Sequence, residues 1–382
     1  MRRLLLLVGA IVFVDTMFYA ALTPLLPEYS DELGLSKAGA GFLSAAYPIG
    51  ALLGGIPGGI AASRFGVRPT VLIGLAGMAV TTMTFGFAES AWLLDLARLL
   101  QGVASSFSWT ASLAWLVAAA QPERRGETIG AAMAAAIFGA LCGPVVGGIA
   151  AVVGTGVAFG SVAAFAAVLA GWAARTPAFR PDAPQPISRL FGALRDQGVR
   201  ASIWFVILPA LLFGALNVLG PLRLDLLGFS AFAIGATWLV MASFEAAIAP
   251  AVGRVSDRRG PLVPIRAGLL AAALVTATLA WVDNRWLLAL LIVAAGSSYG
   301  TFWAPAMSFL TDRSEALRLD HAYGFALINL GWAPGAAAGA ALGGAAARAT
   351  SDAAVYLTLA TLCGLTLVLL APRLRTLAET PA

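Results

Sequence analysis

The chain has 382 residues, of which 60% are hydrophobic and only 11% are charged. A soluble domain carries roughly a quarter charged residues, so this composition excludes an ordinary soluble protein and indicates a polytopic membrane protein. Basic loops of such a protein account for the net charge of +5, so we expect no nucleic-acid partner. Cys142 and Cys363 both fall in apolar segments. This placement indicates neither a disulfide framework nor a metal site, and we expect no cofactor.

Apolar segments of about twenty residues recur along the chain, each long enough to cross a ~30 Å hydrocarbon core as a helix. The first is too long for a signal peptide. If both termini are cytoplasmic, all the Lys and Arg residues of the loops are cytoplasmic except Lys37, Arg223, Arg285 and Arg348, and Arg98 lies within a span. The positive-inside rule therefore predicts cytoplasmic termini. The arginine-rich, alanine- and glycine-rich composition suggests a bacterial cytoplasmic membrane. We expect twelve spans, at residues 4–27, 38–62, 69–88, 91–118, 128–153, 155–174, 201–221, 231–252, 262–282, 286–311, 322–347 and 353–371.

Asp15 lies about half-way along the first predicted span. An acid at the centre of a membrane helix costs ~3 kcal/mol on insertion scales, so it should be paired, protonated or in contact with water. We interpret Asp15 as a proton site or as the counter-charge of a cationic substrate. The alternative is a static ion pair that holds two helices together.

Polar side chains follow one face of the fourth predicted span. At the helix period they fall within a sector of ~140°, which predicts water or a protein interior beside them. Arg98 is at a depth comparable with Asp15, so we expect the two to pair. That pair must weaken before Asp15 can take a proton. The polar residues are Asp95, Arg98, Gln101, Ser105, Ser108 and Ser112.

The fifth predicted span contains an unusual run of glycines around one proline. Gly139, Gly143 and Gly147 form one ridge of a helix, which predicts close approach of a neighbouring backbone. Pro144 removes one helix hydrogen bond and predicts a kink. Gly130 points away from the ridge.

Glu245 is a third intramembrane charge, near the middle of the eighth predicted span. It shares a helix face with Trp238 and Met241, which would suit a bulky apolar or aromatic cation. A structural hydrogen bond is the alternative. The candidate substrate-cavity residues are Tyr19, Gln101, Ser105, Trp109, Asn217, Trp238, Met241 and Tyr299.

The two halves of the chain match each other at a fixed offset. The segments 59–66 and 253–260 align at 194 residues, and so do 92–96 and 286–290. We therefore expect a duplicated six-span unit, an arrangement that places substrate between the halves near the midplane. The predicted parts are an N-terminal six-helix bundle at 1–174, a polar cytoplasmic loop at 175–200, a C-terminal six-helix bundle at 201–371 and a cytoplasmic tail at 372–382.

These patterns resemble the major facilitator superfamily. The glycine run, with Gly148 at its end, is similar to the span 5 antiporter motif of its twelve-span drug:proton antiporters. Arg98-Leu-Leu-Gln101-Gly resembles their R-x-x-Q-G motif, in which the arginine is implicated in proton coupling. The resemblance implies an all-α membrane fold of two pseudo-symmetric six-helix bundles. It also implies gating and packing roles for Gly59, Arg64, Gly66, Gly139, Gly143, Pro144, Gly147, Gly148, Gly253, Asp257, Arg258 and Gly260.

The loop from Gly59 to Arg68 is similar to the superfamily motif G-x-L-A-D-R-x-G-R-R, with Ser63 in place of its aspartate. The second-half loop keeps Asp257, so we expect the stronger cytoplasmic latch there. A carboxylate at a helix N-terminus stabilises by up to ~1 kcal/mol. The alternative is that both loops are only positively charged turns.

The first span also resembles vesicular amine transporters and their bacterial relatives, in which an aspartate of this span takes part in amine recognition. Asp15 occupies that place, although the acids of their later spans have no counterpart in spans 10 and 11. This resemblance favours a cationic substrate other than a vesicular amine.

We therefore expect a monomeric, proton-coupled exporter of small cationic or amphipathic compounds, with Asp15, Arg98 and Glu245 in proton coupling. No phosphate-binding loop is present in the sequence to use ATP. The alternative is a proton-coupled exporter or importer of a metabolite such as a sugar, an amino acid or a siderophore. A membrane enzyme lacks a catalytic constellation, since the single histidine, His321, falls in a predicted loop. A transport-inactive sensor or scaffold would not need intact gating motifs.

Overall fold

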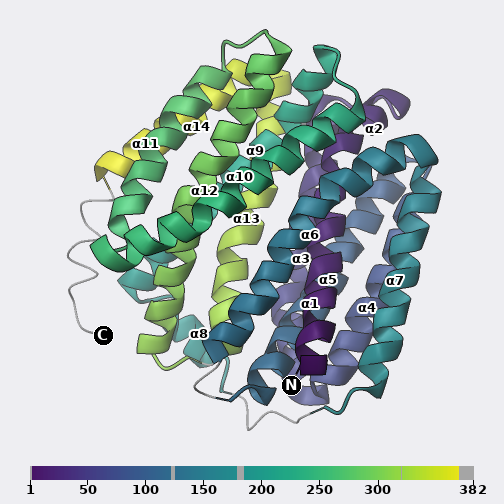
Figure 1. Cartoon of the computed structure of the whole chain (residues 1–382), viewed down its shortest axis with the longest axis vertical. Coiled ribbons are helices and arrows are strands. Elements are labelled where there is room, and N and C mark those ends of the chain that lie inside the picture. The colour runs from purple at the N-terminus through teal and green to yellow at the C-terminus, as the bar shows by residue number, and fades with distance from the viewer. Residues whose placement is uncertain (1, 122–124, 179–184, 320, 370–382) are drawn as a thin grey trace. The chain divides into compact units, whose positions relative to one another are not determined.

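The computed structural model describes residues 2–121, 125–178, 185–319 and 321–369, and within these ranges every regular element is a helix (Figure 1). The all-α fold class predicted from the sequence is confirmed. The predicted tail at 372–382 lies outside the described residues. The side chains of Ser63, Asp257 and His321 also lie outside the described part, so the expected latch at Asp257 stays a prediction.

The chain divides into two compact units, made of residues 1–33 with 46–184, and 34–45 with 185–382. The helices that supply the first unit are α1 Arg2–Ala21, η1 Thr23–Leu25, α2 Leu26–Glu32, α3 Lys37–Phe65, α4 Val67–Gly86, α5 Ala91–Ala119, α6 Arg125–Val153 and α7 Thr155–Arg175. Those of the second unit are α8 Ser188–Ala193, α9 Gln197–Leu226, α10 Ala231–Arg259, α11 Leu262–Leu279, α12 Arg285–Ala316, α13 His321–Ala349 and α14 Asp352–Leu369.

Eleven helices among the described residues are long and apolar enough to cross a membrane. The remaining long helix, α13, coincides with the eleventh of the twelve predicted spans. The polar stretch at 175–200 also contains structure that the sequence did not predict, because the short helix α8 buries Leu190 and Ala193.

Both units use the same helix pairing, which is the structural counterpart of the sequence repeat. In the first unit α1 packs on α6, and α4 packs on α5 and α7. In the second unit α9 packs on α13, and α11 packs on α12 and α14. The five long helices in these pairings therefore have equivalents in the other unit, as a duplicated bundle requires.

Glycine forms the sharp turns between consecutive helices. Gly66 and Gly260 have φ values of +92° and +80° and occupy equivalent positions after α3 and α10. Gly154, with φ +94°, divides α6 from α7. L side chains rarely adopt this conformation, so the positions favour glycine.

Residues 34–45, which include the start of α3, belong to the second unit. Lys37 forms an ion pair with Asp352 at 2.5 Å, and Arg348 donates to the Ser36 hydroxyl at 3.3 Å. Gly41 lies against the backbone of α13 at Ala340. A charged contact and a close backbone contact therefore join this segment to the second unit.

Candidate functional site

Close glycine contacts fix α5, the helix that carries Arg98, against α3 and α4. A β-carbon at Gly54 of α3 would lie 2.8 Å from Val103 O, and one at Gly74 of α4 would lie 2.8 Å from Ala104 O. The Ser106 hydroxyl donates across the α3 interface to Ala51 O at 2.7 Å. Since backbone sets these distances, the rotation of α5 and the direction of its polar face are fixed.

Arg98 is fully buried in the first unit, where it binds backbone and amide oxygens. Its Nη1 donates to Gln101 Oε1 at 3.0 Å and to Phe18 O at 3.5 Å, and its Nη2 donates to Tyr19 O at 3.2 Å. The Nε–H has no hydrogen-bond partner among the described residues. Gln101 in turn donates to the Thr82 hydroxyl at 3.0 Å. The guanidinium therefore binds α1 through carbonyl dipoles.

Four aromatic rings surround the Arg98 guanidinium. Its Cζ lies 5.0 Å from the ring centroid of Tyr47, 5.6 Å from Phe18, 5.7 Å from Phe85 and 5.9 Å from Tyr19. Aromatic faces stabilise a cation by ~2 kcal/mol or more when it is desolvated. This enclosure offsets part of the cost of burying a charge within a span.

Asp15 is buried at the hydroxyl end of Tyr47. Tyr47 Oη lies 3.0 Å from Asp15 Oδ1 and 2.7 Å from Ser105 Oγ. When Asp15 is ionised its carboxylate can only accept, so Tyr47 donates to it and Ser105 supplies the hydrogen between the two hydroxyls. If Asp15 is protonated, both hydroxyls can rotate to accept. The contact therefore suits either protonation state.

The expected direct pairing of Asp15 with Arg98 is not present, because no ion pair joins these two described residues. Tyr47 contacts both, with its hydroxyl on Asp15 and its ring on Arg98. Sequence analysis missed Tyr47, which comes from α3. A tyrosine in a membrane span is too common to draw attention without knowledge of the helix packing.

The polar face of α5 is buried in helix packing. Of the two expected surroundings, water or a protein interior, the structure shows a protein interior, because four of these side chains are at most 5% exposed: Gln101, Ser105, Ser108 and Ser112. Ser108 donates to Ser105 O of its own helix at 3.0 Å, and Ser112 to Trp109 O at 3.1 Å. Among the candidate cavity residues of this unit, Tyr19 and Trp109 are half-buried.

The glycine ridge of α6 lies directly against α1, the helix that carries Asp15. A β-carbon at Gly143 would lie 2.5 Å from Met17 O, while Gly139 and Gly147 contact the α1 backbone at Phe13 and Ala21. Thr16 adds a hydrogen bond from α1 to Ala136 O at 2.8 Å. The α6 helix continues through Pro144, which is buried, as is Gly148. Nothing lies within 4 Å of a β-carbon at Gly130, which is not part of the ridge.

A second glycine ridge, which sequence analysis missed, occupies the equivalent interface of the second unit. Gly331, Gly335 and Gly339 of α13 each follow their α6 counterparts by 192 residues and lie against α9. A β-carbon at Gly335 would lie 2.5 Å from Ile207 O. The spacing of four residues was visible in the sequence and could have identified this ridge.

The second unit buries most of its candidate cavity residues in helix packing. Trp238 donates to Asn217 Oδ1 at 2.8 Å, and Tyr299 shares a hydrogen bond with the Thr276 hydroxyl at 2.8 Å. Trp238, Met241 and Tyr299 are at most 5% exposed, so in this structure they are core residues of the unit. Glu245 is half-buried beside Gly300 of α12.

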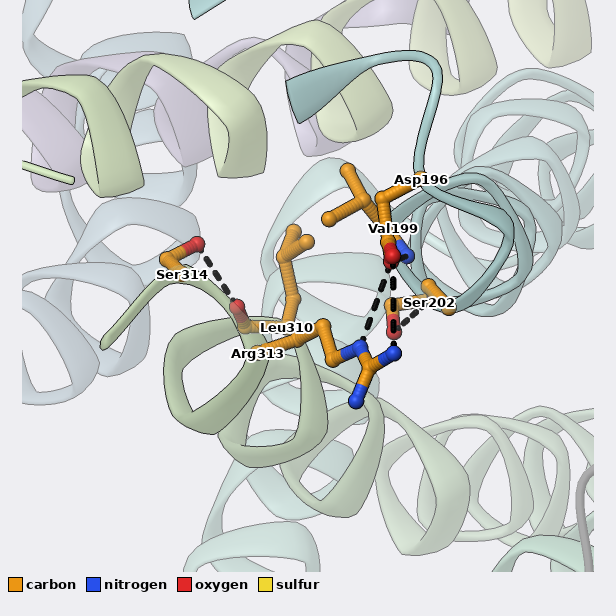
Figure 2. A network of polar contacts seen from close by, with 7 residues as sticks. Asp196, Val199, Ser202, Leu310, Arg313 and Ser314 are labelled. Carbon is orange, nitrogen blue, oxygen red and sulfur yellow. Dashed lines mark hydrogen bonds and ion pairs between the residues drawn. The ribbon is translucent and has the colours of Figure 1, made fainter. Parts of the chain in front are cut away.

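The predicted loop residues show few contacts. Arg64 and Arg258 are exposed, and nothing lies within 4 Å of a β-carbon at Gly59 or Gly253. A different charged contact joins α9 and α12 (Figure 2): Arg313 Nε lies 3.2 Å from Asp196 Oδ1. Asp196 also caps α9 by accepting from Val199 N at 2.9 Å. An aspartate directly before an apolar helix was the available signal.

The sequence profile described as Major Facilitator Superfamily matches residues 8–326. The chain belongs to the major facilitator superfamily. The membership agrees with the duplicated helix pairing and with the resemblance drawn from the motifs.

Curated relatives match over short segments of the chain. The MFS-type transporter ppzB of Metarhizium rileyi is 35% identical over 125 residues, 31% of this chain and 26% of that protein. A probable vesicular acetylcholine transporter-B of Danio rerio is 34% identical over 143 residues, covering 35% and 29% of the two chains. The gallate transporter of Pseudomonas putida is 30% identical over 101 residues, covering 26% and 22%. The matches thus span about a quarter of the relatives' length.

The fold extends over the whole chain. The crystal structure of the human organic anion transporter MFSD10 (TETRAN) matches with a TM-score of 0.73 and 18% identity, covering 96% of this chain and 98% of that one. This likeness shows the major facilitator fold. The relatives show that the superfamily member described here is similar to transporters of several kinds.

Proposed function

We propose that this chain is a proton-coupled secondary transporter that exports small cationic or amphipathic molecules by alternating access. The contact of Asp15 with the Tyr47 hydroxyl, which in turn contacts the Ser105 hydroxyl, carries the proposal. A buried carboxyl with hydroxyl partners in a membrane helix can hold a proton without an ion pair. The Tyr47 ring also lies against Arg98, so a shift of that ring changes the surroundings of both charges.

Protons enter from outside, protonate Asp15 or Glu245 and displace the substrate outward in the proposed cycle. The unloaded carrier returns and releases the proton inside, with both termini in the cytoplasm of a bacterium. A membrane potential is worth ~2.3 kcal/mol per charge per 100 mV, enough for severalfold accumulation gradients. The match to a probable vesicular acetylcholine transporter favours a cationic substrate.

The match to a gallate transporter favours a second candidate function, transport of a small metabolite. A metabolite transporter needs several neutral hydrogen-bonding groups at its substrate site, whereas the hydroxyls and amides of α5 are already bonded within the first unit. We therefore place this function second.

Proteoliposomes with an imposed pH gradient test the proposal. We expect the parent protein to drive efflux of lipophilic cations, and Asp15→Asn, Arg98→Ala and Glu245→Gln each to reduce it. Unchanged proton-driven efflux in all three variants would contradict the role of these charges. A parent that moves gallate or another metabolite, but no cation, would support the second candidate.

A further inference from the structure

Glu245 differs from Asp15 and Arg98 in having no partner among the residues that the structure describes. Asp15 contacts the Tyr47 hydroxyl, and Arg98 has carbonyl and amide acceptors. Glu245 has neither a hydrogen bond nor an ion pair to any residue that the structure describes. A static structural role requires such a partner, so the described contacts give it no support.

The side chain of Glu245 lies against α12 at Gly300. A β-carbon at Gly300 would lie 2.5 Å from Glu245 Cγ and 2.6 Å from its Oε1. One turn earlier, Met241 occupies the equivalent place against Gly296. The two glycines therefore admit both side chains, and the carboxylate rests on the α12 backbone while staying half-buried.

The surroundings of this carboxylate select the kind of cation that it can bind. An inorganic cation such as Ca²⁺ or Mg²⁺ requires several oxygen ligands, and no cluster of three metal-ligating side chains occurs among the described residues. Met241 and Trp238, on the same helix face, are buried in the core of the unit, and Ile248, one turn beyond Glu245, is an exposed apolar side chain. One negative charge beside apolar groups fits an organic cation with apolar substituents.

We propose that Glu245, seated on Gly300, is the counter-charge that recognises an organic cation in the second unit, while the Asp15 network carries the proton. The inference rests on the proposed function and assigns the two acids different tasks. It also makes Gly300 a determinant of specificity, because any larger residue there displaces the carboxylate.

Binding to the purified full-length protein in detergent tests this division. The probe is tetraphenylphosphonium, whose charge does not vary with pH, and triphenylphosphine oxide is its neutral counterpart. We expect Glu245→Gln to weaken binding of the cation about tenfold or more, since a desolvated charge pair is lost. The same substitution should change the dissociation constant of the neutral probe by less than about twofold.

Two further variants separate a local effect from misfolding. Gly300→Ala keeps the carboxylate but displaces it, so it should weaken cation binding in the same way. Gly364→Ala in α14, where nothing lies within 4 Å of the added carbon, is the matched control and should bind as the parent does. Glu245→Asp should recover part of the affinity that Glu245→Gln loses.

The outcomes distinguish this inference from the proposed function. Undiminished cation binding by Glu245→Gln, or no cation binding by the parent at millimolar probe, overturns the inference. Equal loss of the neutral probe also overturns it, because that loss indicates a packing role. Cation binding that requires Glu245, in a protein that a pH gradient does not drive, supports the inference and contradicts the proton-coupled function.

Discussion

At the scale of single residues, Tyr47 connects the two charges of the first unit. Its hydroxyl contacts Asp15 and Ser105, and its ring lies against the Arg98 guanidinium. Neither charge therefore needs the other as an ion-pair partner. Under the proposed function, Tyr47 has a positioning role, in which protonation of Asp15 would move its ring against Arg98.

Removing one hydroxyl tests this role. Tyr47→Phe keeps the ring on Arg98 but deprives Asp15 of a hydrogen bond, whose loss costs about 1–3 kcal/mol for a buried group. We expect proton-driven transport to fall by about tenfold or more, with a displaced pH profile.

Tyr356→Phe is the control for this prediction, because the buried Tyr356 hydroxyl has no hydrogen-bond partner among the described residues. It should keep the activity and pH profile of the parent. Equal activities of the two variants, measured as initial efflux rates against pH, would contradict a role for the Tyr47 hydroxyl.

At the scale of elements, the two glycine ridges decide how closely helices approach. Gly143 and Gly335 occupy equivalent places in the α1–α6 and α9–α13 interfaces, and backbone carbonyls face each of them. A side chain at either place must separate two helices. In the first unit, that separation would also move Asp15.

Gly143→Ala and Gly335→Ala should each destabilise the protein. Overpacking of this kind costs about 1–3 kcal/mol, so the midpoint of thermal unfolding in detergent should fall. Gly130→Ala, which meets nothing within 4 Å, should leave the midpoint equal or raise it, since alanine favours a helix by up to ~1 kcal/mol. Equal unfolding midpoints for all three variants would contradict the claim that the glycine ridges determine how closely these helices pack.

Asp196 connects two elements of the second unit, the start of α9 and the end of α12 (Figure 2). Burial opposes ionisation of this carboxyl. Hydrogen bonds from Val199 N and Arg313 outweigh that effect and lower the pKa of Asp196 below its ordinary value of 3.8. Its contribution to stability is therefore present above that value and is lost as pH falls through the lower pKa of the folded protein.

Asp196→Asn keeps a capping side chain but removes the charge, so we expect a loss of about 0.2–1 kcal/mol near neutral pH. Asp196→Ala removes the cap as well and should lose about 0.5–2 kcal/mol more. In thermal unfolding measured against pH, the advantage of the parent over Asp196→Asn should shrink below about pH 4. An advantage that persists at lower pH would argue against the ion pair.

At the scale of the whole molecule, the sequence was sufficient for the fold. Long apolar segments and the repeat at 194 residues predicted two six-helix bundles, because a membrane span must be a long apolar helix. The polar face of α5 was also predictable, since the helix period alone places Arg98, Gln101 and Ser105 together.

The partners of these groups were not predictable in the same way. Lipid and protein interior are both apolar, so a membrane helix carries little pattern to show which face packs inward. Trp238 and Met241 were for this reason expected at a cavity, and the structure buries them in the second unit. Tyr47 was missed because glycine contacts between α3 and α5 determine its position.

Coupling of proton movement to cation movement is the central claim, and it can be measured directly. Proteoliposomes that contain a pH-sensitive dye are given a gradient of a lipophilic cation and no pH gradient. We expect cation flux through the parent to move protons in the opposite direction, and Asp15→Asn to abolish the proton signal. Cation flux without any proton movement in the parent, or an equal proton signal in Asp15→Asn, would contradict it.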